Sequence, residues 1–170
     1  IRPRAALLCA AIAFPALASA QRGTGAEWPI YGGDPGHTRY SSLDQIDASN
    51  AARLEVAWRW SSRNQGPNPL AASQTTPIYV NGLLYATAGV RRNVVAIDPA
   101  TGETIWTYRM DEGARLDAAP RVNSGRGVSY WSDGNGDDRI IVVTPGYHLV
   151  ALDAATGQPV ASFGRNGVVD

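Results

Sequence analysis

The residues of this sequence that most directly suggest chemistry are a run of acidic and amide side chains, Asp133-Gly134-Asn135-Gly136-Asp137-Asp138. Oxygen ligands at alternating positions suit a hard cation such as Ca²⁺. No glutamate follows at the place where an EF-hand loop supplies its bidentate ligand. Because the same composition is typical of tight turns, we interpret Asp133–Asp138 as the tip of a hairpin.

The histidines and the cysteine offer no further site. His37 and His148 stand alone, without the spacing of metal ligands, so we expect both to be structural. The single cysteine, Cys9, excludes an internal disulfide and a cysteine-based metal cluster. All 15 basic side chains are arginine and they balance 15 acidic ones, so the formal charge gives no reason to expect a nucleic-acid partner.

The first twenty residues have the three parts of a signal peptide. Arg2 and Arg4 form a basic start, residues 5–17 are apolar and uncharged, and Ala18-Ser19-Ala20 fits a small-x-small cleavage pattern. The apolar run is shorter than the roughly 20 residues that span a bilayer. The alternatives are an N-terminal membrane anchor or a buried helix. We therefore expect a cleaved signal peptide at residues 1–20 and export, in a bacterium to the periplasm.

Beyond about residue 54 the sequence predicts an all-β fold of short strands separated by turns. Each run is β-branched or aromatic and is bounded by Gly, Pro, Asn or Asp. Asn81-Gly82 predicts a two-residue type I′ hairpin, because both positions of that turn need positive φ. Before the strands, only two short helical turns are expected, at residues 43–46 and 48–54. The expected strands are Leu54–Trp60, Ile78–Val80, Leu83–Thr87, Val94–Ile97, Thr104–Tyr108, Ile140–Val143, Leu149–Leu152 and Val160–Phe163.

A repeat with an offset of 55 residues indicates the architecture. Val94–Tyr108 aligns without gaps with Leu149–Phe163, and six of the fifteen positions are identical. A period of this size, built from strand–turn–strand units without a helix, favours a blade of a β-propeller. Two blades do not close a ring, so we interpret residues 21–170 as an incomplete, N-terminal part of a propeller domain.

The repeated unit has a physical interpretation. The Asp98 carboxylate is placed to accept backbone N–H groups in the turn, and Gly102 supplies a left-handed backbone conformation. Trp106 then points toward the neighbouring blade, because a blade cannot bury both of its faces alone. The second copy has Ala161 in place of this tryptophan.

The pattern Ala-x-Asp-x-x-Thr-Gly-x-x-x-Trp at Ala96–Trp106 resembles the tryptophan-docking repeat of quinoproteins. These are eight-bladed propeller dehydrogenases that use pyrroloquinoline quinone (PQQ). Other segments of the chain are also similar to that family: Trp28–Ile46, Leu54–Trp58, Gln74–Pro77 and Gly125–Trp131. The resemblance implies that the chain holds the first strand segment of the propeller and about two blades.

The resemblance also implies two PQQ contacts in this chain, Gln74 and Arg126. PQQ is a tricarboxylate with an ortho-quinone, and a guanidinium offers such oxygens a planar fork of donors. Gln74 can donate and accept in the plane of the ring system. Without the resemblance, Arg126 would be interpreted as a surface or ion-pairing arginine and Gln74 as a polar residue at a strand end. The family's Ca²⁺ ligands and catalytic base are expected beyond residue 170.

Alcohol-oxidising members of the family carry two adjacent cysteines five or six residues before the arginine. Pro120 and Arg121 stand there in this chain, which favours the glucose-dehydrogenase-like branch. The implied activity is oxidation of a sugar, polyol or other alcohol, with electrons passed to ubiquinone or cytochrome c. Peripheral membrane association is compatible with this activity, and the isolated chain is expected to be inactive.

Two alternatives remain at this point. A non-enzymatic periplasmic propeller that scaffolds outer-membrane protein assembly has similar repeats, but gives no reason for Gln74 and Arg126. The other alternative is a quinoprotein alcohol dehydrogenase that lacks the cysteine pair.

Overall fold

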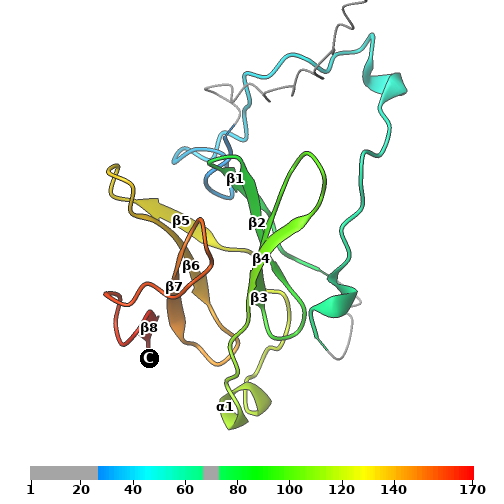
Figure 1. Ribbon diagram of the computed structural model, residues 1–170. Helices are drawn as coiled ribbons and strands as arrows, with labels where there is room; N and C mark the ends of the chain where they lie inside the picture. The colour runs from blue at the N-terminus through cyan, green and yellow to red at the C-terminus, as the bar shows by residue number, and fades with distance from the viewer. Residues whose placement is uncertain (1–26, 67–72) are drawn as a thin grey trace, which may run out of the picture.

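The computed structural model describes residues 27–66 and 73–170, so the predicted signal peptide and Cys9 lie outside the described residues. A long N-terminal segment leads into two antiparallel sheets that stand side by side (Figure 1). The described helical elements are short: 3₁₀ turns at Ala51–Arg53 and Ser62–Asn64, and helix α1 at Ala114–Asp117. None of them has the length and apolar character needed to cross a membrane. The all-β prediction is confirmed.

Each sheet is a four-stranded meander in which every strand pairs antiparallel with the next one along the chain. The first sheet contains β1 (Ile78–Val80), β2 (Leu83–Ala88), β3 (Asn93–Ile97) and β4 (Thr104–Tyr108). The second sheet contains β5 (Ser129–Ser132), β6 (Asp138–Val143), β7 (Leu149–Asp153) and β8 (Val168–Val169). The meander is the strand order of a propeller blade.

The turns that the sequence predicts are present. Asn81 and Gly82 join β1 to β2 with φ of 51° and 81°, as a type I′ turn requires. The Asp98 carboxylate accepts the backbone N–H groups of Ala100 at 2.6 Å and Thr101 at 3.2 Å. Local sequence therefore determines how these strands are joined.

The main core lies between the two sheets. It forms because alternate residues of a strand point to the same face, so Val94 and Ala96 of β3 face the second sheet while Val95 and Ile97 face away from it. Both faces of β3 are buried, because Trp58 and the neighbouring Trp60 cover the outer one. The buried residues of the inter-sheet core are Ile78, Val80, Tyr85, Val94, Ala96, Ile140, Val142, Val150, Leu152 and Ala154.

Trp106 docks the first sheet on the second, as predicted. Its indole Nε1 donates to the Ala154 carbonyl at 3.1 Å, and the buried Tyr85 hydroxyl donates to the same oxygen at 3.1 Å. Burial raises the pKa of Tyr85 to about 12, so this donor stays protonated. The indole lies on Gly157, where an added Cβ would come within 2.5 Å of the ring. The glycine of the repeat is therefore required for this contact as well as for its φ of 71°.

Trp58 makes the same contact on the other side of the first sheet. Its Nε1 donates to the Pro99 carbonyl at 2.9 Å, and a Cβ added to Gly102 would lie 2.7 Å from the indole. However, the strand predicted at Leu54–Trp60 is wrong: no strand is assigned there, and Leu54 is 61% exposed. The described residues contain no neighbouring strand to complete a ladder with this segment, and β propensity alone does not form one.

The strand predicted at Val160–Phe163 is wrong, as is one of the two predicted helical turns. Val160–Phe163 is not a strand, because its residues lie in a turn and β8 takes the fourth place in the second sheet. Pro159 at its start has no N–H to give to a ladder. The helical turn expected at residues 43–46 is absent. The one expected at 48–54 is present, as a turn at residues 48–50 followed by the 3₁₀ turn at Ala51–Arg53.

The interpretation of Asp133–Asp138 as a hairpin tip matches the structure. This segment joins β5 to β6, and Asp138 is already the first residue of β6. The Asp133 carboxylate accepts the backbone N–H groups of Asn135 at 2.7 Å and Asp137 at 3.0 Å. Acidic side chains therefore stabilise the turn itself.

Candidate functional site

Gln74 and Arg126 occupy corresponding places in the two meanders. Gln74 lies shortly before β1 and Arg126 shortly before β5, so both lie at the same end of their sheets. In the structure, both residues line one open cavity of about 610 Å³. Its other walls come from the N-terminal segment, from the link between the sheets, and from β6 and β7.

Backbone contacts fix the segments that carry these two residues. The Thr76 N–H donates to the Arg126 carbonyl at 3.1 Å, and the Gln74 N–H donates to the buried Ser124 hydroxyl at 3.2 Å. Gly127 has a φ of 122°, and a Cβ there would lie 2.7 Å from the Thr76 carbonyl oxygen. Only glycine permits this approach, so the sequence sets the spacing between the two segments.

Arg92, in the turn between β2 and β3, ties the first sheet to the second. Its Nε donates to the Asn123 carbonyl at 3.3 Å, and its Nη1 donates to the Val143 carbonyl at 2.9 Å. Its guanidinium also packs against Gly125, where an added Cβ would lie 2.6 Å from Nε. Burial lowers the pKa of Arg92, but an arginine remains charged at neutral pH. Arg92 therefore holds the link that leads to Arg126.

The Glu112 carboxylate, in the link between the two sheets, binds the turn between β6 and β7. Its side chain is 2% exposed and accepts hydrogen bonds from the Thr144 hydroxyl, the Gly146 N–H at 3.0 Å and His148 Nδ1 at 2.6 Å. Burial acts to raise the pKa of Glu112, but these donors outweigh it and leave the pKa below its ordinary value. His148, expected to be structural, binds this carboxylate and, through Nε2, contacts Arg115.

The cavity that contains Gln74 is strongly positive. Arg92, Arg121 and Arg126 line it, and no carboxylate is among the described residues around it. In the part of the chain that the structure describes, the guanidiniums of Arg121 and Arg126 form no hydrogen bond or ion pair. Charged donors without protein acceptors, beside the amide of Gln74, suit an anionic ligand rich in oxygen. The donor set therefore fits a tricarboxylate with a quinone.

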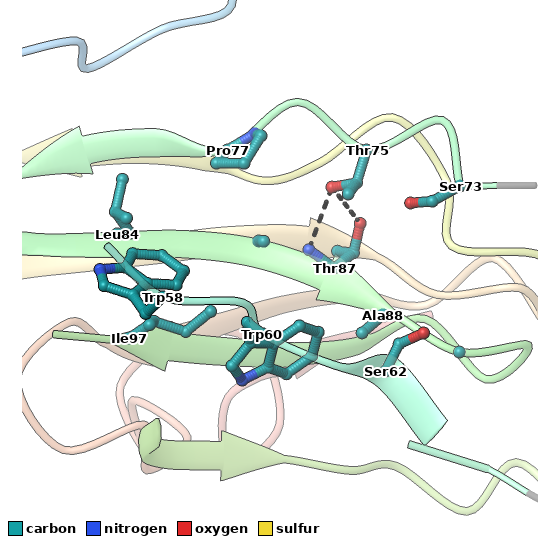
Figure 2. Close-up of a pocket in the computed structure, with 12 residues that line it drawn as sticks. Trp58, Trp60, Ser62, Ser73, Thr75, Pro77, Leu84, Thr87, Ala88 and Ile97 are labelled. Carbon is teal, nitrogen blue, oxygen red and sulfur yellow. Dashed lines mark hydrogen bonds between the residues drawn. The ribbon is translucent and has the colours of Figure 1, made fainter. Parts of the chain in front are cut away.

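A second cavity, of about 290 Å³, lies on the outer face of the first sheet (Figure 2). Trp58, Trp60, Leu84 and Ile97 form its apolar wall, and Thr75 accepts hydrogen bonds from the backbone N–H and the hydroxyl of Thr87 at 3.2 and 3.0 Å. No charged side chain is among its described lining residues. Trp58 and Trp60 pack on the sheet, and the uncharged lining of the cavity does not suit a polyanion.

The sequence did not predict the roles of Arg92, Ser124 and Glu112. Each acts through a contact with a residue more than 30 positions away, and no local pattern marks such contacts. The one sequence signal near the site is the pair of glycines that flank Arg126. Gly125 and Gly127 both have positive φ in the structure. They indicate a backbone shaped by close neighbours.

Residues 28–170 match the family model described as PQQ: glucose/ethanol/alcohol dehydrogenase, beta-propeller domain. The chain is 34% identical over 153 residues to the glycerol dehydrogenase large subunit of Gluconobacter oxydans (strain 621H), covering 85% of this chain and 20% of that protein. It is 34% identical over 160 residues to the quinoprotein glucose dehydrogenase of the same strain, covering 85% and 19%.

A solved structure also resembles this chain in fold and sequence. The quinohemoprotein alcohol dehydrogenase of Comamonas testosteroni superposes with a TM-score of 0.59 at 36% identity, covering 77% of this chain and 18% of that chain. The predicted β-propeller fold is therefore confirmed. The chain spans about a fifth of the length of the curated relatives named above.

Proposed function

This chain belongs to the family of PQQ-dependent quinoprotein dehydrogenases, and from that premise we propose that the protein containing it oxidises a sugar, polyol or other alcohol. The observation that carries the proposal is the single cavity lined by both Gln74 and Arg126. The scaffold alternative gives no reason for Gln74 and Arg126 to line one cavity. The family membership and the cavity together favour the enzyme over the scaffold.

The chain's own residues would hold the cofactor. Arg126 offers a planar pair of donors to a carboxylate or carbonyl oxygen, and Gln74 offers one donor and one acceptor. The Thr76–Arg126 and Gln74–Ser124 hydrogen bonds hold the backbone segments of the two residues at a set spacing. This preorganisation lowers the entropic cost of binding. PQQ, when bound, supplies the two-electron acceptor chemistry. We propose Ca²⁺ as a second cofactor, with ligands and catalytic base beyond residue 170.

The substrate proposed is a sugar or polyol. The support comes from the resemblance to the family. Gln74 stands where alcohol-oxidising members usually carry glutamate and glucose-type members glutamine, and Pro120-Arg121 stand where the alcohol-oxidising members carry two cysteines. Relatives of this chain are named for glycerol, glucose and alcohol, so the test is a direct comparison. Full-length enzyme loaded with PQQ and Ca²⁺ should turn over glucose or glycerol faster than ethanol. Faster turnover of ethanol would instead support the alcohol dehydrogenase alternative.

The compartment and the electron acceptor belong to the same proposal. We propose a periplasmic enzyme that passes electrons to ubiquinone or cytochrome c, with peripheral association to the inner membrane. The support is the signal-peptide pattern at residues 1–20. Cell fractionation with an antibody to the mature protein tests the compartment, and recovery in the cytoplasm would contradict it.

The experiment that tests PQQ binding is an equilibrium titration of the full-length protein. Replacing Arg126 by alanine should weaken PQQ binding roughly 10- to 100-fold, because a charge-assisted hydrogen bond contributes on the order of 1.5–3 kcal/mol. Arg53→Ala, in an exposed 3₁₀ turn, is the matched control and should leave the affinity unchanged. A full-length protein that binds no PQQ would refute the enzyme proposal and favour the scaffold.

A further inference from the structure

Arg121 lies where two cavities meet. It lines the cavity of about 610 Å³ that holds Gln74 and Arg126. It also lines a neighbouring cavity of about 330 Å³, whose other walls are Arg92, Pro120, Pro145 and Tyr147. A side chain at this boundary can reach a ligand in the larger cavity from the side of the link between the sheets.

Among the described residues, Arg121 forms no salt bridge with an acidic side chain. No Asp or Glu is among the described residues that line either cavity. Glu112, whose charge acts on Arg92, already accepts hydrogen bonds from Thr144, Gly146 and His148. Burial lowers the pKa of Arg92 most, the charges of Glu112 and Tyr147 raise it, and the nearby charge of Arg121 lowers it by a smaller amount. A bound anion would relieve this repulsion.

The three arginines of the cavity differ in how much of their donor capacity is used. Arg92 is committed to backbone carbonyls of the second sheet and its link. Arg121 and Arg126 have no side-chain partner among the described residues, so their donors are left for a ligand. A ligand with several carboxylates can satisfy two guanidiniums at once.

We propose that the Arg121 guanidinium forms an ion pair with a carboxylate of bound PQQ, as a second cationic contact beside Arg126. This inference rests on the proposed function and goes beyond it, because it assigns a binding role to the residue that replaces one of the two cysteines of alcohol-oxidising members. Arg121 then contributes affinity through charge.

The first test is PQQ titration of the full-length Arg121→Gln variant, followed by fluorescence. The affinity should fall about tenfold or more, as expected for loss of a charge-assisted hydrogen bond. Arg91→Gln is the matched control, because Arg91 is an exposed arginine of the β2–β3 turn that lines a different cavity. It removes the same charge and should leave the affinity unchanged.

The second test uses the trimethyl ester of PQQ, which keeps the rings and the quinone but lacks the carboxylate charges. The difference in affinity between wild type and Arg121→Gln should disappear with the ester, and Arg121→Lys should recover part of the affinity for PQQ. Equal PQQ affinity of wild type and Arg121→Gln would overturn the assignment. An equal loss for acid and ester would overturn the ion pair.

The outcome also separates this inference from the proposed function. If wild type binds PQQ and Arg121→Gln binds it equally well, only the role of Arg121 is refuted. If full-length wild type binds no PQQ, the proposed function fails and the Arg121 assignment fails with it.

Discussion

The two sheets contain the same repeated turn but continue from it into different structures. In the first sheet the Asp98 N–H donates to the Glu103 carbonyl at 2.8 Å, and the Gly102 N–H donates to the Asp98 carbonyl at 2.8 Å. In the second sheet Asp153 and Gly157 form the equivalent bonds at the same two distances. The turn is therefore encoded locally and does not depend on the structure of the residues after it.

The residues after the turn show the difference. In the first sheet they form β4, whose Trp106 docks on the second sheet. In the second sheet Pro159 forms only an isolated bridge to Leu152, Ala161 lies in a turn, and the fourth strand is the later β8. A fourth strand thus needs free N–H groups and a neighbouring face on which to pack, and the turn alone does not supply either.

The largest effect should come from removing the docking residue of the first sheet. Trp106→Ala should lower the free energy of unfolding of the full-length protein by about 3 kcal/mol, because it removes a large, half-buried side chain and the hydrogen bond to Ala154. Urea denaturation measures the change. Val122→Ala, at an exposed position in the link, is the control and should cost under about 0.5 kcal/mol. A loss below about 1 kcal/mol for Trp106→Ala would show that its docking contributes little.

A smaller effect should separate backbone strain from packing at the repeat glycine. Gly157 and Gly134 have nearly the same φ, 71° and 74°, but only Gly157 lies under an indole. Alanine at either site costs about 1 kcal/mol for the left-handed backbone, and at Gly157 it must also displace Trp106. Gly157→Ala should therefore destabilise the protein by about 1–2 kcal/mol more than Gly134→Ala. Equal losses in thermal unfolding would mean that the indole adjusts freely.

The hydrogen bonds of Glu112, in the link between the sheets, to the β6–β7 turn give a pH-dependent stabilisation of about 1–2 kcal/mol at neutral pH. The folded-state pKa of Glu112 lies below its ordinary value of 4.5. Its carboxylate therefore stabilises the fold above pH 4.5, and this contribution is lost as the pH falls through the folded-state pKa. Glu112→Gln should destabilise the protein at pH 7 and progressively less as the pH is lowered below 4.5. A difference that does not vary with pH would show that the charge is unimportant.

Much of the fold could be predicted because its signals are local. The strand positions from β1 to β4, the Asn81-Gly82 hairpin and the repeat turns all depend on neighbours in sequence. β5 is not among the predicted strands, because Ser129-Tyr130-Trp131-Ser132 is short and has serine at both ends. Its place in the second sheet depends on pairing with β6. Long-range pairing also explains why Leu54–Trp60, although rich in strand-forming residues, is not assigned as a strand.

The candidate site also depends on long-range contacts that local sequence does not reveal. Gln74 and Arg126 could be proposed only from resemblance to a family, since each alone is an ordinary polar residue. Their shared cavity depends on Thr76, Ser124 and Arg92, whose contacts cross from one sheet to the loops of the other. Such contacts are set by the packing of the two sheets, which no spacing in the sequence records.

The most direct test of the central claim is a crystal structure of the full-length protein with PQQ. The quantity to measure is the distance from the Arg126 guanidinium nitrogens to the nearest cofactor oxygen. We predict a hydrogen-bond distance of about 2.7–3.2 Å, with the cofactor in the cavity that Gln74 also lines. Cofactor density elsewhere, with Arg126 turned to solvent, would contradict the account.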